Sequence, residues 1–350
     1  MSTLRTLLLP LLIPLSYFYG FIIAIRNCLY NISFFQFVSF DIPIISVGNI
    51  TTGGTGKTPM VIYLAKLLES NGFRPGIVSR GYGRNSKGIV MVHDGNSLLT
   101  DVYSAGDEPF LMGKELNTIP LIVSENRTAG IKELLDKCSV DVVVLDDAFQ
   151  HRSVGRNMDM VMISAYDNLD DYHILPWGKL RESINGLKRA QCVIYTKTTQ
   201  FQNPSIHKIL KPYLMNSPTA SIMKSMLMKI DETGYHKTLP IDEPVFAFCG
   251  IANPTNFIQT VKEMGLKITG ELIFQDHQKY NKQVLQDLSV QVQSSNCRAV
   301  VTTEKDMVKI PEPFMKKFMF YVIKIYVVFE NDSDIIDLIK PVFLPVAEDS

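Results

Sequence analysis

The segment from Ile44 to Thr58 constrains the fold of this chain more than any other. The apolar run Ile44 to Val47 predicts a buried strand, and a glycine-rich stretch from Gly53 to Thr58 precedes the helical pattern of Met60 to Glu69. Strand, glycine loop and helix in this order are the setting of a phosphate-binding loop. Glycines let successive backbone N–H groups turn toward phosphate oxygens, and the helix N-terminus adds favourable partial charge. The segment therefore predicts an α/β fold built around a nucleotide phosphate site.

Two side chains in this loop have expected roles. Lys57 is expected to reach the β- and γ-phosphates, and Thr58 to place its hydroxyl on Mg²⁺. The full consensus has Gly six residues before the lysine, where this chain has Thr51, so Gly53 and Gly54 must supply the flexibility of the loop. A glycine-rich turn without a ligand is the alternative. The residues expected to bind the nucleotide are Thr51, Thr52, Gly53, Gly54, Thr55, Gly56, Lys57 and Thr58.

A second motif lies about ninety residues further on. The apolar run Val142 to Leu145 ends in two acids, Asp146 and Asp147, which is the Walker-B pattern of a carboxylate near Mg²⁺ and the phosphates. An Asn-Lys-x-Asp motif for guanine is absent, since Thr303 to Asp306 has its Lys and Asp adjacent. These features predict ATP as the nucleotide, with Mg²⁺.

From Pro43 onward, apolar strands alternate with helical patterns, which predicts a mostly parallel sheet covered on both faces. The rhythm is lost over residues 198–243 and resumes afterwards. We therefore expect an α/β chain in four parts: an N-terminal membrane-associated helix (1–26), a P-loop domain (27–197), a connecting segment (198–243) and a smaller second α/β domain (244–350).

Composition excludes some classes of protein. Lys plus Arg and Asp plus Glu both number 35, so no global positive field gathers nucleic acid, and a nucleic-acid partner is not expected. The 46% hydrophobic fraction is that of a folded chain. Five scattered cysteines with no zinc spacing indicate reduced, buried thiols in a reducing compartment.

The N-terminus carries twenty uncharged residues, Thr6 to Ile25, between two arginines. That length just spans a hydrocarbon core of about 30 Å, although Pro10, Pro14 and Gly20 interrupt it. A membrane anchor or shallow interfacial insertion is the first interpretation. A buried core helix and a signal peptide are the alternatives, and the region around Ala24 is a poor cleavage site. The aromatic stretch Phe34 to Phe40 could extend a contact with lipid.

The loop alone leaves open whether the chain is a nucleotide-driven switch or partitioning ATPase, or a small-molecule kinase. Partitioning ATPases carry an additional Lys before the paired glycines, where this chain has Thr52, which counts against that class. The whole set of motifs resembles one family, tetraacyldisaccharide 4′-kinase, the lipid A 4′-kinase. The matching segments are 46–49, 53–59, 79–84, 106–109, 146–152, 175–182, 250–254, 274–277 and 302–306. One departure is Gln278, where family members often have a second His.

The resemblance implies transfer of the γ-phosphate of ATP to the 4′-hydroxyl of a lipid disaccharide 1-phosphate. It also implies two α/β/α units with the active site between them, on the cytoplasmic face of a bacterial inner membrane, and no obligate protein partner. The alternative is a membrane-associated P-loop ATPase that couples hydrolysis to a protein partner.

The resemblance also assigns catalytic residues. Asp107 is the expected general base, with His277 as its partner, although Gly-Asp-Glu-Pro is equally a good helix start. Glu108 and Asp146 are candidate Mg²⁺ ligands together with Thr58. Asp147 is expected either to bind the metal or to organise neighbouring side chains.

Arginine suits phosphate recognition because its planar fork binds two oxygens. The residues expected on the lipid side are Tyr82, Arg127, Gln150, His151, Arg152 and Arg181. For Arg127 a structural ion pair is an equal alternative. Trp177, the only Trp of the chain, fits a membrane–water interface or a buried domain edge. Segments 251–254 and 302–306 are expected to line the adenine or to pack the two units together.

Overall fold

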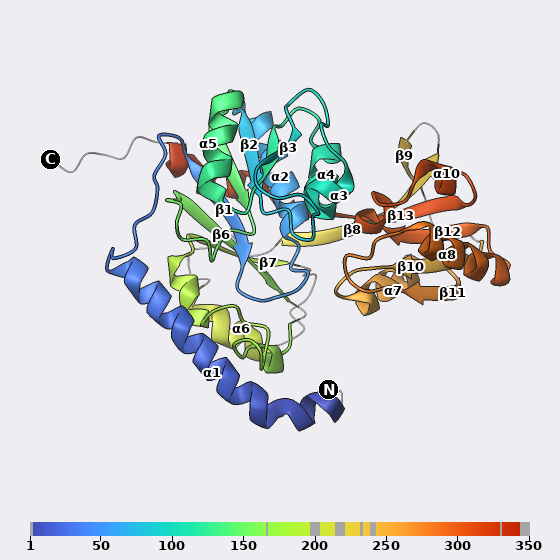
Figure 1. Ribbon diagram of the computed structural model, residues 1–350, viewed down its shortest axis with the longest axis horizontal. Helices are drawn as coiled ribbons and strands as arrows, with labels where there is room; N and C mark the ends of the chain where they lie inside the picture. Colours follow the sequence, from blue (N-terminus) through green and yellow to red (C-terminus); the bar gives the residue numbers. More distant parts are fainter. Residues whose placement is uncertain are drawn as a thin grey trace.

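Two sheets organise the chain, and each is covered by helices on both faces (Figure 1). The computed structural model describes residues 3–165, 167–196, 204–213, 221–231, 234–238, 243–329 and 331–343. We refer to the sheet formed by β1–β7 and its helices as the first unit, and to the sheet formed by β8–β13 and its helices as the second unit. The predicted fold class, mixed α/β with mostly parallel sheets and an N-terminal apolar helix, is confirmed.

The first sheet has seven strands. In spatial order they are β3 (Val90–His93), β4 (Leu121–Val123), β2 (Pro75–Ser79), β5 (Val142–Asp146), β1 (Ile44–Asn49), β6 (Met158–Ser164) and β7 (Cys192–Thr196). Only β3 runs antiparallel to its neighbour. The central strands are buried over their full length, which is why they read as continuous apolar runs.

Helices cover both faces of this sheet, and successive strand residues pack against opposite layers. Val142 and Val144 pack with α2 (Lys57–Ser70) and α4 (Asp107–Glu115), whereas Val143 and Leu145 pack with α5 (Arg127–Lys137). Strands β1 and β5 are parallel neighbours, and Val47 pairs with Asp146. Their carboxyl ends therefore lie side by side at the same edge of the sheet. This edge is where the phosphate loop begins.

The second sheet has six strands in the spatial order β11 (Ile268–Ile273), β10 (Val245–Cys249), β12 (Ala299–Thr303), β13 (Met319–Phe329), β8 (Ser221–Asp231) and β9 (Gly234–Lys237). Its helices include α7 (Pro254–Glu263), α8 (Lys282–Ser294), α9 (Glu304–Met307) and α10 (Glu312–Met315). Phe246 and Phe248 pack toward α8, while Ala247 and Cys249 pack toward α7. Both faces of the sheet are therefore apolar, as in the first unit.

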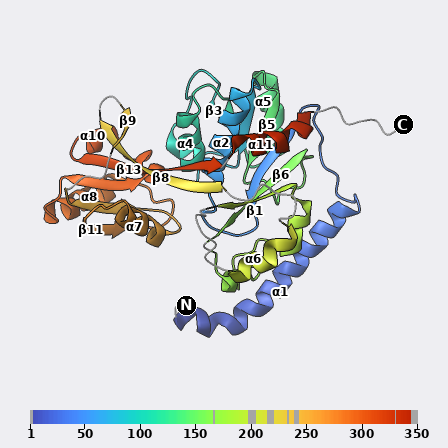
Figure 2. The same ribbon diagram turned by 180° about the vertical axis from the view of Figure 1, so that it is seen from behind.

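A long antiparallel ribbon joins the two units. β8 and β13 pair from Ser221–Phe329 to Ile230–Phe320, and their far ends reach the first unit (Figure 2). There the ring of Phe329 lies 5.1 Å from that of Tyr63 on α2. Helix α11 (Asp332–Ile339) then packs on the first unit, with Ile335 and Ile339 in its core.

Two parts of the chain thus differ from the expected division. Residues 198–243, expected to connect the units, include β8 and β9 of the second sheet. Part of 244–350, expected to form the second unit, returns to the first as α11. The cause of the first difference is that β8 mixes Lys224 and Lys229 with apolar residues and pairs antiparallel with both of its neighbours, so it lacks the apolar run of a central parallel strand.

Helix α1 (Thr3–Asn31) lies along the outside of the first unit, near α6 (Pro204–Leu210) (Figure 1). Among the described residues it is the one helix long and apolar enough to cross a membrane, over Leu7–Asn31. Its large apolar side chains are exposed, at Leu7, Leu11, Tyr17, Phe18, Phe21, Ile22 and Ile25. The alternative of a buried core helix is therefore wrong.

Close packing at β1 gives a prediction of stability. A Cβ on Gly48 would lie 2.6 Å from Cβ and 2.9 Å from the backbone N of Phe149, and neither atom can move freely. We expect Gly48→Ala to lower the free energy of unfolding by about 1–3 kcal/mol, the usual cost of overpacking, measured by urea titration. Gly54→Ala is the control, because no atom of the other described residues, its chain neighbours aside, lies within 4 Å of its Cβ position. Equal stability of both variants would contradict the prediction.

Candidate active site

The phosphate loop connects the end of β1 to the first residue of α2. Gly53 and Gly56 adopt positive φ angles of 124° and 89°, which L side chains rarely reach. The buried amide of Asn49 donates a hydrogen bond of 2.9 Å to the Thr55 hydroxyl and ties the loop to its strand. The space beside Gly53 and Gly54 is open, with no atom of the described part of the chain, apart from the immediate neighbours in sequence, within 4 Å of either Cβ position. The loop is therefore shaped by its glycines and has room on its surface for a ligand.

Asp147 gathers two cations at this loop. Lys57 Nζ lies 3.6 Å and Arg181 Nη1 2.8 Å from the same oxygen, Oδ1 of Asp147. Burial acts against the charged carboxylate, but Lys57 and Arg181 outweigh it and hold the pKa of Asp147 below its ordinary value. Asp147 is thus an anion that organises Lys57 and Arg181.

Asp146 has a different environment from its neighbour. Its Oδ2 accepts a hydrogen bond of 2.7 Å from the Ser79 hydroxyl, whereas its buried Oδ1 has no hydrogen-bond partner among the residues that the structure describes. Burial, and next the negative charges of Glu108 and Asp147, raise the pKa of Asp146 to about 6. A cation beside Oδ1 would relieve this cost.

These features fit a magnesium site. The unpaired Oδ1 of Asp146 and the buried hydroxyl-bearing Thr58 are oxygen donors of the kind Mg²⁺ prefers. Within the described residues, no group of three or more His, Cys, Asp or Glu side chains is arranged to hold a metal by itself. Mg²⁺ usually takes one or two carboxylates plus water and substrate phosphates, so a site of this type matches that pattern.

Asp107 and His277 meet across the two units, 170 residues apart in the chain. His277 Nδ1 lies 2.9 Å from Oδ2 and 3.1 Å from Oδ1 of Asp107, and the ring of Tyr82 lies 5.2 Å from that of His277. Asp107 is the first residue of α4, while Gly106 occupies the N-cap position. The Asp107 carboxylate also accepts a hydrogen bond from the backbone N–H of Glu108. Its principal long-range partner is nevertheless the imidazole.

Groups on the second unit favour the ionised form of Asp107. Burial opposes the charge of Asp107, but the hydrogen bond from His277 and the ammonium groups of Lys305 and Lys309 hold its pKa below the ordinary value. The hydrogen bond to Asp107 is the main cause that raises the pKa of His277. Asp107 is therefore a carboxylate that can accept a proton.

The second unit supplies two lysines that the sequence analysis did not single out as functional. Lys305 forms an ion pair with Glu108, and Lys309 Nζ lies 3.8 Å from Oδ2 of Asp107. Lys305 and Lys57 hold the pKa of Glu108 below its ordinary value against the opposing effect of burial. The charges of Lys305 and of Lys57 in the phosphate loop both act on Glu108, which is the residue next to Asp107. The phosphate loop and Asp107 therefore lie on the same side of the molecule. In the sequence, the only indication of these lysines was the matching segment from Thr302 to Asp306, which contains Lys305.

A family model covers nearly the whole chain. The family model described as "LpxK: Tetraacyldisaccharide-1-P 4'-kinase" matches residues 8–343. The chain belongs to this family. A relative named "Tetraacyldisaccharide 4'-kinase" from Desulfotalea psychrophila is 36% identical over 301 residues, covering 85% of this chain and 86% of the relative. One of the same name from Chlorobaculum tepidum is 36% identical over 310 residues, covering 86% and 87%.

A solved structure of the LpxK family is similar over its whole length. LpxK from Aquifex aeolicus, described as the "apo" form in complex with ATP, superposes with a TM-score of 0.77 at 31% sequence identity. The match covers 98% of this chain and 100% of that one. The resemblance inferred from the motifs is confirmed.

Four of the residues expected to contact the lipid divide into two groups in this LpxK-family chain. Tyr82 is 67% exposed and stands beside His277, and Arg181 faces Asp147. Arg127, by contrast, is 2% exposed and donates to the backbone carbonyls of residues 124 and 146. Arg152 donates to the backbone carbonyl of residue 27 and the side chain of residue 31 on α1. Direct lipid contact therefore remains a prediction for all of them, with structural partners already present for Arg127 and Arg152.

Of the two remaining residues of that set, Gln150 contacts the end of β1, where the phosphate loop starts. Gln150 donates to the backbone carbonyl of Asn49 at 2.9 Å and to the carboxylate of Glu182 at 3.0 Å. His151, the next residue, has a pKa lowered to about 4 by burial and by nearby guanidinium groups, Arg127 first. Glu182 was part of a matching motif but received no role from the sequence, and it is fully buried.

His151 gives a pH prediction. Its pKa in the folded chain is about 4 against an ordinary 6.5, so between these values the unfolded chain binds more protons. Its contribution to stability is therefore lost as pH falls from about 6.5 to about 4. Asp146, with a pKa of about 6, acts in the opposite direction. We expect the melting temperature of His151→Gln to fall less than that of the unmodified protein over this range, and identical pH profiles would contradict the assignment.

Proposed function

We propose that this chain is a lipid kinase that transfers the γ-phosphate of ATP to the 4′-hydroxyl of a tetraacyldisaccharide 1-phosphate. The observation that carries the proposal is the pair Asp107–His277, held across two units on the same side as Lys57 of the phosphate loop. Membership of the LpxK family supports the choice of substrate. We further propose that α1 and the aromatic residues that follow it hold the enzyme at the cytoplasmic face of a bacterial inner membrane.

The chemistry needs a proton acceptor and positive charge. Asp107 accepts the proton of the 4′-hydroxyl, and the N–H of His277 keeps the carboxylate oriented by donating to it. Lys57 and Arg181 lie beside one carboxylate oxygen of Asp147 and supply charge where the transferred phosphoryl group gathers negative charge. Mg²⁺, held by Asp146 and Thr58 with Glu108 as a further candidate, would neutralise charge on the phosphate oxygens.

The assignment is tested with γ-labelled ATP and Mg²⁺ on the full chain in vesicles. We expect label in tetraacyldisaccharide 1-phosphate and none in a matched lipid whose 4′ position already carries phosphate. ATP hydrolysis without label in the lipid would contradict the proposal and support the alternative of an ATPase coupled to a protein partner.

A further inference from the structure

Helix α1 is attached to the first unit by polar contacts along one of its faces. The hydroxyl of Ser16 donates to the carbonyl of Ile174 at 2.6 Å, and the hydroxyl of Tyr19 donates to the carbonyl of Arg181 at 3.1 Å. The amide of Asn27 donates to the carboxylate of Glu182 at 3.1 Å. We call Ser16, Tyr19 and Asn27 the α1 seam. Their spacing keeps them on one side of the helix.

The seam is unlike the rest of α1. Ser16 is 4% exposed, whereas its neighbour Tyr17 is 70% exposed. Gly20 lies on the seam side and allows close approach, since a Cβ there would be 3.1 Å from the side chain of Ile174. A helix that served only as an anchor would need no hydrogen bonds to one loop. The polar contacts therefore suggest that α1 determines where the 174–182 loop lies.

That loop is itself part of the phosphate site. The backbone N–H of Arg181 donates to the carbonyl of Ile50 at 2.7 Å, and that of Thr52 donates to the carbonyl of Lys179 at 2.8 Å. The backbone at the start of the phosphate loop is thus hydrogen-bonded to the backbone of residues 179–181. The guanidinium of Arg181 then reaches Asp147, which also holds Lys57. Tyr19 is therefore hydrogen-bonded to Arg181, and Arg181 contacts both the start of the phosphate loop and the carboxylate of Asp147.

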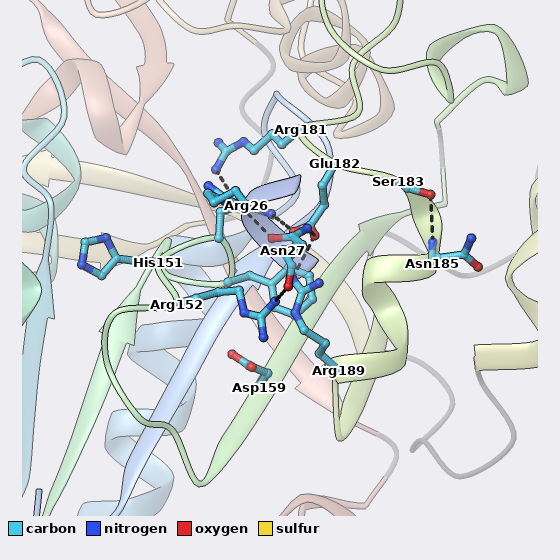
Figure 3. A network of polar contacts seen from close by, with 12 residues as sticks. Arg26, Asn27, His151, Arg152, Asp159, Arg181, Glu182, Ser183, Asn185 and Arg189 are labelled. Carbon is cyan, nitrogen blue, oxygen red and sulfur yellow. Dashed lines mark hydrogen bonds and ion pairs between the residues drawn. The ribbon is translucent and has the colours of Figure 1, made fainter. Parts of the chain in front are cut away.

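Glu182 provides a second route from α1 to the same place (Figure 3). Its buried carboxylate accepts from Asn27, from Gln150 at 3.0 Å and from Arg189 at 3.0 Å. The amide of Gln150 also donates to the carbonyl of Asn49, the last residue of β1. A buried charge with several partners fixes geometry well, because losing any partner is costly. Asn27 is therefore connected, through Glu182 and Gln150, to the end of β1, where the phosphate loop begins.

We propose that α1 is a positioning element of the active site, whose seam holds the 174–182 loop so that Arg181 and Gln150 keep the phosphate loop in register. Ser16, Tyr19 and Asn27 act through that loop and contact no substrate. The kinetic consequence rests on the proposed kinase function, whereas the structural consequence does not. On this proposal one helix, α1, both holds the protein at the lipid and keeps the phosphate site ordered.

Tyr19→Phe tests the seam with the loss of a single hydroxyl. Tyr17→Phe is the matched control, with the same chemical change two residues away on the exposed face. In phosphatidylethanolamine–phosphatidylglycerol vesicles we expect Tyr19→Phe to lower kcat by about three- to tenfold, the usual effect of one neutral hydrogen bond. The KM for the lipid and the fraction that floats with the vesicles should stay unchanged. Asn27→Leu, which breaks the second route, should act in the same direction.

Trp177 gives a readout that needs no substrate. It is the only Trp of the chain, it lies inside the 174–182 loop, and its ring stacks on His173 at 3.6 Å. We expect Tyr19→Phe and Asn27→Leu to increase quenching of its fluorescence by acrylamide, and Tyr17→Phe to leave it unchanged. If the effect of Tyr19 runs through Arg181, it should shrink in an Arg181→Lys background, as a double-mutant cycle shows.

The outcomes separate this inference from the proposed function. Seam variants that match the unmodified protein in both kcat and quenching overturn the inference, as does a fall in kcat that only follows loss of vesicle binding. If the unmodified chain labels no lipid while quenching still increases in the seam variants, the proposed function fails and the positioning role stands.

Discussion

Asp107→Asn is expected to lower kcat for phosphorylation of the lipid by about 10²–10⁴-fold, the range that general-base catalysis contributes. The amide keeps the size of the side chain and an oxygen for the N–H groups of Glu108 and His277, but it cannot take the proton of the acceptor hydroxyl. Nucleotide binding should stay largely intact, because Asp107 pairs with His277 and the lysines of the second unit rather than with the phosphate loop. The measurement is single-turnover transfer of label, with a separate titration of an ATP analogue.

Asp276→Asn is the control for this experiment. Asp276 adjoins His277 in the chain and its carboxylate lies 3.9 Å from Nε2 of that ring, but its side chain is 43% exposed. An exposed charge at this distance interacts only weakly with the imidazole. We therefore expect kcat of Asp276→Asn to change by no more than about threefold. Near-normal transfer by Asp107→Asn, or an equal loss in both variants, would remove Asp107 from the role of base.

Lys57→Met should lower kcat by about 10²–10³-fold, in the range found when one preorganised donor to transition-state charge is removed. Methionine retains the apolar stem and removes the ammonium that lies 3.6 Å from Asp147. Arg181 keeps its own bond to Asp147, so the carboxylate does not lose all its positive partners. The KM for ATP is expected to rise as well, since binding and transfer use the same group.

Lys66→Met makes the same replacement on the same helix. Lys66 is 52% exposed and its partner is Glu115, away from the phosphate loop. Its kcat should stay within about twofold of the unmodified enzyme, because exposed ion pairs contribute little. Comparable losses at both positions would mean that α2 has been destabilised and that Lys57 has no specific part in transfer.

Local patterns carried much of the sequence-based prediction. The phosphate loop, β1, α2 and the Asp146–Asp147 pair lie within short segments, so strand periodicity and glycine spacing were enough to place them. The pairing of Asp107 with His277 spans 170 residues, and only the family resemblance predicted it. Separation of this kind leaves no periodic signal in the chain.

Other features depend on packing that sequence patterns do not encode. Arg127 and Arg152 have the residue type that phosphate recognition favours, yet backbone carbonyls and α1 already engage them. Lys305 and Lys309 were missed because only the folded chain brings α9 and the turn after it to α4. The chain alone could not separate a buried first helix from an exposed one, because both are equally apolar in sequence.

The β8–β13 ribbon has a consequence for how the two units can move relative to each other. Ten consecutive residue pairs from Ser221–Phe329 to Ile230–Phe320 run from the second sheet to α2. A relative motion of the two units that parts His277 from Asp107 would bend or twist this double strand. The two units are thus coupled through paired backbone, and their separation would deform a hydrogen-bonded ladder instead of swinging on a single linker strand.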